Sequence, residues 1–273
     1  MKWNRVYLTK GGQPLIAPSG VSCRVGRLIR LTLLLFFLST ATVLTAFGSP
    51  ETTESQGNPS NSVITLPSPK SEGTLSLEEA LNKRGAVRDY SPQPLSLENL
   101  AQLLWAGCGI QVDAVSGPTR TAPSAGALYP QELFVFIGHV EHSENSSESG
   151  SVDSIESGVY RYEPRDHRLV QLYNEDRREE LALAALNQSF IAQAPAVIVI
   201  GGVVERTAAK YGTRGAERYV FLDAGHSAQN ISLQATSRGL ASAIVGAFAD
   251  EKVTALLAGA EALPLYIIPV GQP

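Results

Sequence analysis

The stretch that decides the fold is RTAPSAGALYP, residues 120–130, which is followed after Gln131 by ELFVFIG, residues 132–138. The first part is a run of small residues between two prolines, and such a run lets backbone amides approach a flat ligand closely. The same run also fits an ordinary tight turn. The second part has the composition and length of a strand. Together they predict a close-packed loop that leads into a buried strand.

The segments on either side alternate between helical and strand patterns. Apolar residues at helical spacing predict helices at 77–84, 96–107, 176–188, 217–239 and 250–257. Apolar and β-branched runs predict strands at 132–138, 196–204, 242–245 and 264–270, and a hairpin formed by 158–162 and 169–173. Residues 140–157 are rich in Ser and Glu and predict a solvated loop. This interleaving indicates an α+β sandwich, with a mixed central β-sheet between helical layers.

The N-terminal part differs from the rest in composition. Residues 31–47 are apolar and uncharged, follow a basic stretch and precede Gly48, which is the layout of a signal peptide within residues 1–48. A retained membrane anchor (31–47) is the alternative, and a misassigned start codon is a third. Residues 49–73 are rich in Ser, Thr, Pro, Asn and Glu and predict a flexible linker to a folded domain at 74–273. The expected location is therefore extracytoplasmic or membrane-anchored, or cytoplasmic if the start codon is misassigned.

Charge argues against a nucleic-acid-binding protein, and the cysteine content leaves one cysteine in a processed chain. Residues 1–48 contain six basic residues and no acidic residue, so the remainder of the chain has 16 basic and 26 acidic residues. Such an acidic body argues against binding nucleic acid, because phosphate contacts need clustered Lys and Arg. Cys23 lies in the presumed targeting segment, so a processed chain keeps only Cys108, which follows an apolar helical stretch and is expected to be a small buried residue.

Several familiar motifs are absent or weak. No GxGxxG follows a strand and no GxxxxGK[ST] occurs, so neither a dinucleotide fold nor a phosphate loop is supported. His139 and His142 fit a solvated loop better than a metal site, and no metal is expected. Ser124, Asp223 and His226 have the residue types of a hydrolytic triad, but Ser124 lacks the GxSxG elbow and the other two share one helix, which disfavours a hydrolase.

Arg84 and Arg88 follow the first predicted helix and are four residues apart. Their forked guanidinium groups suit a phosphate dianion. The alternative is two surface arginines in the last turn of a helix, where cations are favoured in any case. The other informative segments are small-residue loops and aromatic-basic runs: KYGTRG at 210–215, AGHSAQN at 224–230, VGAFAD at 245–250 and PLYIIPVG at 264–271.

PSAGALYP, KYGxRG and AGHxxQN in this order resemble the nitroreductase family, and within it the SagB-type dehydrogenases that include thiazoline and oxazoline oxidases. The resemblance extends from about residue 75 to residue 273. It implies a nitroreductase-like three-layer fold, a homodimer with FMN at the subunit interface, and hydride transfer through flavin N5 in a ping-pong cycle, with NAD(P)H as a donor.

Carried over residue by residue, the resemblance implies three sets of flavin contacts and one catalytic pair. Arg84 and Arg88 resemble the pair that holds the FMN phosphate and ribityl chain. The loop that lies against the flavin from the partner subunit corresponds to Pro123, Ser124 and Ala125, and the loop near flavin N5 corresponds to Ile244, Gly246 and Ala247. Lys210 and Tyr211 match the catalytic Lys-Tyr pair of azoline-oxidising members, in which Lys is the base. A lysine on a surface lid is the alternative for Lys210.

The resemblance leaves the substrate open. Reduction of a nitro or quinone acceptor by NAD(P)H and oxidation of an azoline-type or other small substrate, including a modified peptide, both fit. The family's first motif commonly reads RRSxR, whereas Gly85 and Ala86 stand here at the second Arg and the Ser. A non-catalytic flavin-binding or scaffold protein with a degenerate nitroreductase fold is therefore the alternative function.

Overall fold

The computed structural model describes residues 62–113, 117–141 and 154–273. The predicted targeting or anchoring segment, the first part of the predicted linker and the centre of the Ser-rich loop lie outside these residues. The expected signal peptide and the expected location of the protein therefore stay predictions.

A seven-stranded sheet forms the centre of the domain, in the order β1-β9-β8-β5-β10-β12-β11. Every pairing in this sheet is antiparallel, whereas the sequence pattern indicated a mixed sheet. The parallel pair of the described residues joins β2 and β6 in a small separate sheet. The strands of the main sheet are β1 (Val63–Thr65), β5 (Gln131–Ile137), β8 (Gly158–Glu163), β9 (Arg168–Tyr173), β10 (Ala196–Gly202), β11 (Ala241–Ser242) and β12 (Leu263–Gly271).

Both faces of the sheet are buried, because successive side chains of a strand point to opposite faces. Leu133, Val135 and Ile137 of β5 belong to one apolar cluster, and Phe134 and Phe136 of the same strand belong to the other. All five are fully buried. The central strands therefore read as continuous apolar runs in the sequence.

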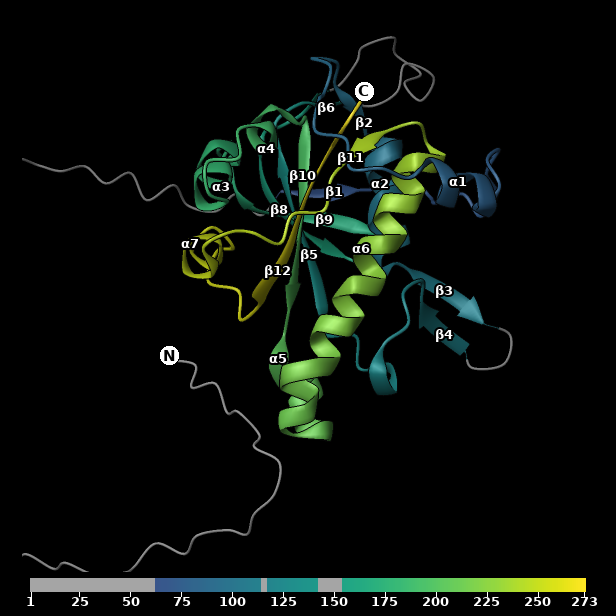
Figure 1. Ribbon diagram of the computed structural model, residues 1–273, viewed down its shortest axis with the longest axis vertical. Helices are drawn as coiled ribbons and strands as arrows, with labels where there is room; N and C mark the ends of the chain where they lie inside the picture. Colours follow the sequence, from purple (N-terminus) through teal and green to yellow (C-terminus); the bar gives the residue numbers. More distant parts are fainter. Residues whose placement is uncertain (1–61, 114–116, 142–153) are drawn as a thin grey trace, which may run out of the picture. The chain divides into compact units, whose positions relative to one another are not determined.

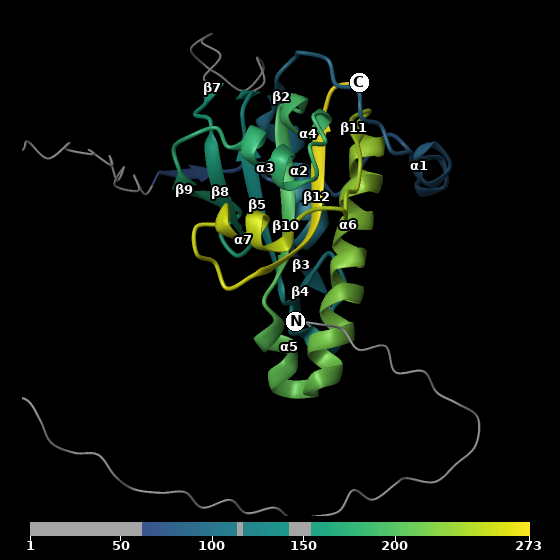
Figure 2. The ribbon, with the colours of Figure 1, turned by 60° about the vertical axis from the view of Figure 1, so that its left-hand side comes forward.

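Helices cover both faces and complete three layers (Figures 1 and 2). α2 (Leu97–Cys108) and α6 (Val220–Ser237) pack on the first cluster. The second cluster is covered by α3 (Arg178–Ala184) and α7 (Asp250–Ala255), together with the short α4 (Phe190–Gln193). The predicted α+β three-layer class is confirmed.

The long predicted helix at 217–239 is present, but it is preceded by a helix that was not predicted. α5 (Val204–Tyr211) ends at Gly212, whose φ of 57° turns the chain, and a π-helical turn at Gly215–Tyr219 leads into α6. Thr207 of α5 donates a hydrogen bond to the carbonyl of Gly215 at 3.2 Å. α5 and the start of α6 therefore form a hairpin at one end of the domain (Figure 1).

Ordered structure begins before residue 74, so the linker is shorter at its C-terminal end than predicted. β1 pairs with β9, and Leu66 is 5% exposed. The carbonyl of Pro67 lies 2.9 Å from Nε2 of His167, and Lys70 exchanges two backbone hydrogen bonds with the Gln102 side chain at 2.9 Å. The composition of this segment did not predict its order, because its few apolar residues are ordered only by packing on a hairpin that is distant in the sequence.

The Ser-rich loop and two shorter segments also differ from expectation. The ends of the loop form β6 (Val140–Glu141) and β7 (Ser154–Ile155), which join β2 (Leu95–Ser96) in a small sheet. β3 (Ile110–Asp113) and β4 (Gly117–Arg120) form an unpredicted hairpin. α1 (Leu77–Lys83) has the predicted capping box between Ser76 and Glu79. His139 is exposed, and His142 lies outside the described residues.

The transmembrane prediction is corrected by the helices of the structure. Within residues 62–113, 117–141 and 154–273, no helix has the length and apolar character needed to cross a membrane. The segment 31–47, on which the prediction rested, lies outside the described residues.

Candidate functional site

Arg84 and Arg88 lie on an extended segment that follows α1. The backbone N–H of Val87, between them, donates to the carbonyl of Ser242 at 2.9 Å, which fixes the segment beside β11. Both arginines are exposed, and neither has an ion-pair partner among the described residues. The guanidinium carbon of Arg88 lies 5.5 Å from the centre of the Phe190 ring. The segment thus presents two uncompensated positive charges at the edge of the sheet.

The loop that follows β11 lies next to this segment. Val245 is buried and exchanges two backbone hydrogen bonds with Ile267 of β12, both 2.9 Å long. Ile244 is half-buried, whereas Gly246 and Ala247 are exposed. The nearest atom to a Cβ added at Gly246 would be a ring carbon of Tyr266 at 3.8 Å, so the backbone here is open to a ligand. The structure brings the predicted phosphate-binding arginines and the predicted ring-binding loop to one end of the domain.

The small-residue loop is held by the first turns of α6. The hydroxyl of Ser124 donates to Oδ2 of Asp223 at 2.6 Å, and the N–H of Ala125 points to both oxygens of the same carboxylate at 3.2 and 3.3 Å. Nδ1 of His226 lies 3.2 Å from the carbonyl of Pro123. The side chain of Asp223 is 4% exposed. A buried carboxylate therefore sets the position of the loop.

The backbone of this loop is unusual, and part of it contacts the predicted catalytic pair. Gly126, Ala127 and Tyr129 have φ values of 64°, 55° and 47°, and the first two lie in the short 3-10 turn η1 (Ala125–Ala127). A left-handed backbone is costly for the non-glycine residues Ala127 and Tyr129, and such strain gathers at functional sites. A side chain at Gly126 would collide with the hydroxyl of Tyr211 and come within 2.9 Å of Nζ of Lys210. The loop therefore packs directly against the end of α5.

Lys210 and Tyr211 are the last two residues of α5. Lys210 is exposed, and its Nζ lies 5.4 Å from the centre of the Tyr211 ring. Tyr211 in turn packs edge-on against Tyr219, with ring centres 5.0 Å apart. The tyrosine ring is thus fixed between the loop and the start of α6, and it carries the lysine beside Gly126.

The predicted site residues therefore form two clusters rather than one. The arginine cluster, defined as Arg84, Arg88 and residues 244–247, lies beside β11, which follows the C-terminal end of α6. The lysine cluster, defined as residues 123–126, Lys210 and Tyr211, lies at the N-terminal end of α6. With 18 residues, α6 is about 27 Å long. One chain separates the two clusters by much of that length (Figure 1).

Asp223 has a role that the sequence did not indicate. The sequence gives it only the residue type of a disfavoured hydrolytic triad, whereas the structure gives it three contacts to the loop backbone and to Ser124. The sequence signal for this role is the position of Asp223 on the apolar face of a predicted helix, because a buried carboxylate needs hydrogen-bond partners.

The comparison with known protein families decides to which family the chain belongs. The profile of the nitroreductase family matches residues 81–272. The chain belongs to the nitroreductase family. The matched range includes the residues of both clusters, among them Arg84, Arg88, Ser124, Lys210 and Ala247. Both clusters therefore lie within the part of the chain that the family profile covers.

Relatives support the same family membership. A nitroreductase-family protein of Methanocaldococcus jannaschii is 42% identical over 198 residues, which are 72% of this chain and 91% of the relative. The crystal structure of a nitroreductase-family protein from Ralstonia eutropha has a TM-score of 0.61 and 26% identity, covering 77% of this chain and 89% of the other. The microcin synthetase complex of E. coli, with truncated pro-MccB17 bound, shares the fold with a TM-score of 0.54 and 20% identity, over 85% and 84% of the two chains.

Asp223→Asn is expected to destabilise this nitroreductase-family domain by about 1 to 3 kcal/mol, because a buried carboxylate that accepts from a hydroxyl and an amide is replaced by a group with one acceptor. Thermal unfolding measures the effect. The control is Asp250→Asn on the exposed first turn of α7, for which a change within about 0.5 kcal/mol is expected. Equal melting temperatures for wild type and Asp223→Asn would show that the carboxylate does not hold the loop.

Proposed function

We propose that this protein is an FMN-dependent oxidoreductase whose reaction site is completed by a second copy of the chain. Membership of the nitroreductase family supports flavin chemistry. The observation that carries the proposal is the separation of the arginine cluster from the lysine cluster at opposite ends of α6. In a symmetric dimer, two α6 helices that run antiparallel bring the N-terminal end of one beside the C-terminal end of the other. Each arginine cluster then meets the partner's lysine cluster.

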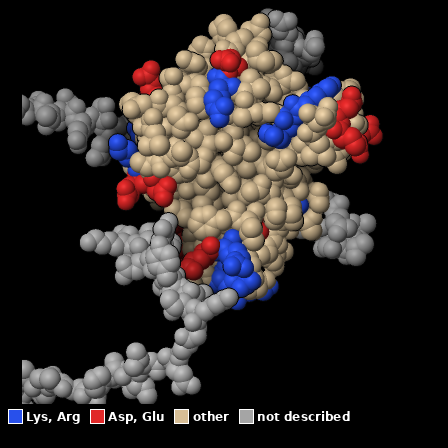
Figure 3. Space-filling view, in the orientation of Figure 1, with Lys and Arg blue, Asp and Glu red and all other residues tan. Residues whose placement is uncertain are grey.

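The surface around α6 supports such pairing. Phe221 and Leu222, on the first turn of α6, are exposed by 48% and 54%. Leu77 and Leu81 on α1 are exposed by 61% and 53%. The face in Figure 3, on which α6 lies, has few charged side chains over its middle, and the Lys, Arg, Asp and Glu residues gather toward its edges. An apolar area with a charged rim is typical of a protein interface.

The residues of the arginine cluster fit FMN. Two exposed guanidinium groups without a carboxylate partner suit a phosphate dianion, and the open backbone at Gly246 suits a flat ring. Arg84 and Arg88 would hold the phosphate, and Ile244, Gly246 and Ala247 would contact the ring from the same chain. Pro123, Ser124 and Ala125 would contact it from the partner chain. When bound, FMN supplies hydride transfer at N5.

The lysine cluster has the groups needed to handle a proton. Because Gly126 contacts both Lys210 and Tyr211, these two residues would reach the site together with the loop, from the partner chain. Lys210 would hold or take a proton of the substrate, and the fixed Tyr211 ring would orient the lysine. NAD(P)H-dependent reduction of a nitro or quinone acceptor and oxidation of an azoline-type group are both compatible with these residues.

Mixed dimers test whether the site is shared between chains. Lys210→Ala and Arg84→Gln/Arg88→Gln chains with different affinity tags are co-expressed, and dimers that carry both tags are isolated. We expect each variant alone to be inactive and the mixed dimer to regain about half of the wild-type activity, because one of its two sites has intact arginines and an intact lysine. Mixed dimers as inactive as the parents would mean that all these residues act within one chain.

A further inference from the structure

A second polar site lies outside both clusters, in a pocket of about 330 Å³ between the start of β5, the β8–β9 hairpin and α5. Four arginines line it: Arg120, Arg161, Arg165 and Arg206. Three acids also line it: Glu132, Glu163 and Asp166. We call it the arginine pocket. The lining thus has one arginine more than acids, although the overall charge of the chain is −4.

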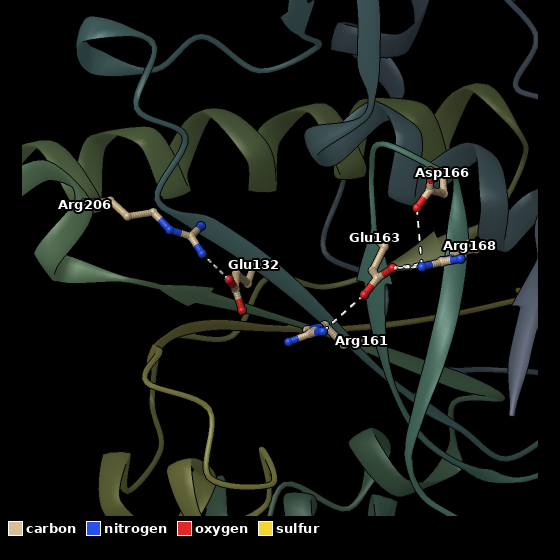
Figure 4. A network of polar contacts seen from close by, with 6 residues as sticks. All are labelled: Glu132, Arg161, Glu163, Asp166, Arg168 and Arg206. Carbon is tan, nitrogen blue, oxygen red and sulfur yellow. Dashed lines mark hydrogen bonds and ion pairs between the residues drawn. The ribbon is translucent and has the colours of Figure 1, made fainter. Parts of the chain in front are cut away.

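Two of the four arginines are neutralised by carboxylates (Figure 4). Arg206 pairs with Glu132, and Arg161 pairs with Glu163 at 3.1 Å. Glu163 and Asp166 are also engaged by Arg168, at 2.8 and 3.4 Å. All three acids that line the pocket are therefore already occupied by a cation.

The other two arginines, Arg120 and Arg165, have no carboxylate partner in the part of the chain that the structure describes. Arg120 is half-buried, and one of its amino groups donates to the carbonyl of Cys108 at 2.9 Å. Burial raises the pKa of the Cys108 thiol to about 12, and it also raises the pKa of the Tyr162 hydroxyl, so neither group supplies a negative charge. A half-buried guanidinium without a counter-charge is costly unless an anion binds to it.

The pocket is connected to the lysine cluster through Tyr129. The guanidinium of Arg120 lies 5.4 Å from the centre of the Tyr129 ring, and Arg206 donates to the Tyr129 carbonyl at 3.3 Å. Arg206 also lies one turn before Lys210 on α5. Tyr129 ends the loop whose Gly126 contacts Lys210 and Tyr211. A molecule anchored in the pocket would therefore lie beside the candidate reaction site.

We propose that the arginine pocket binds a phosphate group of a molecule used by the reaction site. Two guanidinium groups without partners match the charge of a phosphate dianion, and forked guanidinium donors match its oxygens. Arg120 and Arg165 make the direct contacts. Arg161 and Arg206, held by Glu163 and Glu132, form the walls. The proposal that the bound molecule is a reactant rests on the proposed oxidoreductase function. The proposal that the pocket binds phosphate does not depend on that function.

The test is a calorimetric titration of the full-length protein with inorganic phosphate. Because Arg84 and Arg88 are expected to bind the phosphate of FMN, every protein in the series carries Arg84→Gln and Arg88→Gln, which silences that site. Arg165→Gln is added in one protein, and Arg120→Gln together with Arg165→Gln in another. Lys252→Gln, on the exposed face of α7, is the control that removes one positive charge elsewhere.

We expect saturable binding of one phosphate per chain, weakened about tenfold by Arg165→Gln and further by the double change, because a charge-assisted hydrogen bond is lost with each arginine. Lys252→Gln leaves the affinity unchanged. Arg165 is exposed and has no described partner, so its loss does not disturb folding. Absence of saturable binding, or binding that Arg165→Gln and the double change leave as it was, overturns the proposal.

Competition identifies the source of the phosphate. NADP⁺ and NAD⁺ differ by one phosphate group on a ribose. If NADP⁺ displaces inorganic phosphate and NAD⁺ does not, the pocket binds the donor's ribose phosphate. If neither displaces it, the bound phosphate belongs to another reactant and the site itself stands. The flavin content of the wild-type protein, measured on its visible spectrum, reports separately on the proposed oxidoreductase function.

Discussion

Replacing Arg84 and Arg88 together by Gln is expected to weaken FMN binding by about a hundredfold or more, because each charge-assisted hydrogen bond to a phosphate contributes about 1.5 to 3 kcal/mol. The two arginines are exposed and form no ion pair in the described residues, so the melting temperature of the flavin-free protein is expected to stay unchanged. Quenching of FMN fluorescence during titration measures the dissociation constant.

The control for this variant is Arg177→Gln, which removes an arginine that is paired with Glu175 and belongs to neither cluster. Its FMN affinity is expected to equal that of the wild type. If Arg84→Gln/Arg88→Gln also binds FMN with wild-type affinity, the phosphate is held elsewhere, and the arginine cluster loses its assigned role.

The second large effect is expected for Lys210→Gln, which should lower the turnover rate by about a hundredfold or more, since a positioned acid or base contributes about 10²-fold to 10⁴-fold. FMN affinity should change little, because the proposed role of Lys210 is to hold or take a proton of the substrate and not to contact the flavin. Steady-state turnover with each substrate class, together with the FMN titration, separates the two effects.

Lys210→Arg distinguishes proton transfer from simple electrostatics. Arginine keeps the positive charge but does not give up its proton at any accessible pH. If Lys210 moves a proton, Lys210→Arg should be as slow as Lys210→Gln. A Lys210→Arg protein with near wild-type turnover would mean that only the charge beside Tyr211 matters, and full turnover in Lys210→Gln would place the reaction elsewhere.

The layered core could be predicted because its pattern is local. In β5, alternate side chains enter opposite clusters, and in α6 the small residues Ala224 and Ala228 lie on the buried face. Such periodicities are legible in a single segment. β1 escaped prediction because its three residues lie in a Ser- and Pro-rich stretch and become a strand only by pairing with β9. α5 escaped because its sequence, VERTAAKY, has many polar residues and begins one residue after the Gly201-Gly202 end of β10, within the predicted strand at 196–204.

The candidate site shows the same limit. The resemblance predicted which residues bind FMN, but the grouping of those residues depends on contacts between segments far apart in the chain. The hydrogen bond from Val87 to Ser242 and the close approach of Gly126 to Lys210 and Tyr211 have no signature in the sequence. For that reason only the structure shows that Lys210 and Tyr211 lie beside Pro123–Ala125 of the same chain. The contacts of Asp223 with this loop are likewise visible only in the structure.

The most direct test of the account is a visible-spectrum titration of the purified full-length protein with FMN, combined with a measurement of its mass in solution. The account predicts flavin absorption bands that stay with the protein, saturating at one FMN per chain in a particle of two chains, and bleaching of those bands without oxygen when a nicotinamide donor or an oxidisable substrate is added. A protein that stays colourless after reconstitution, or that holds FMN as a single chain, would contradict it.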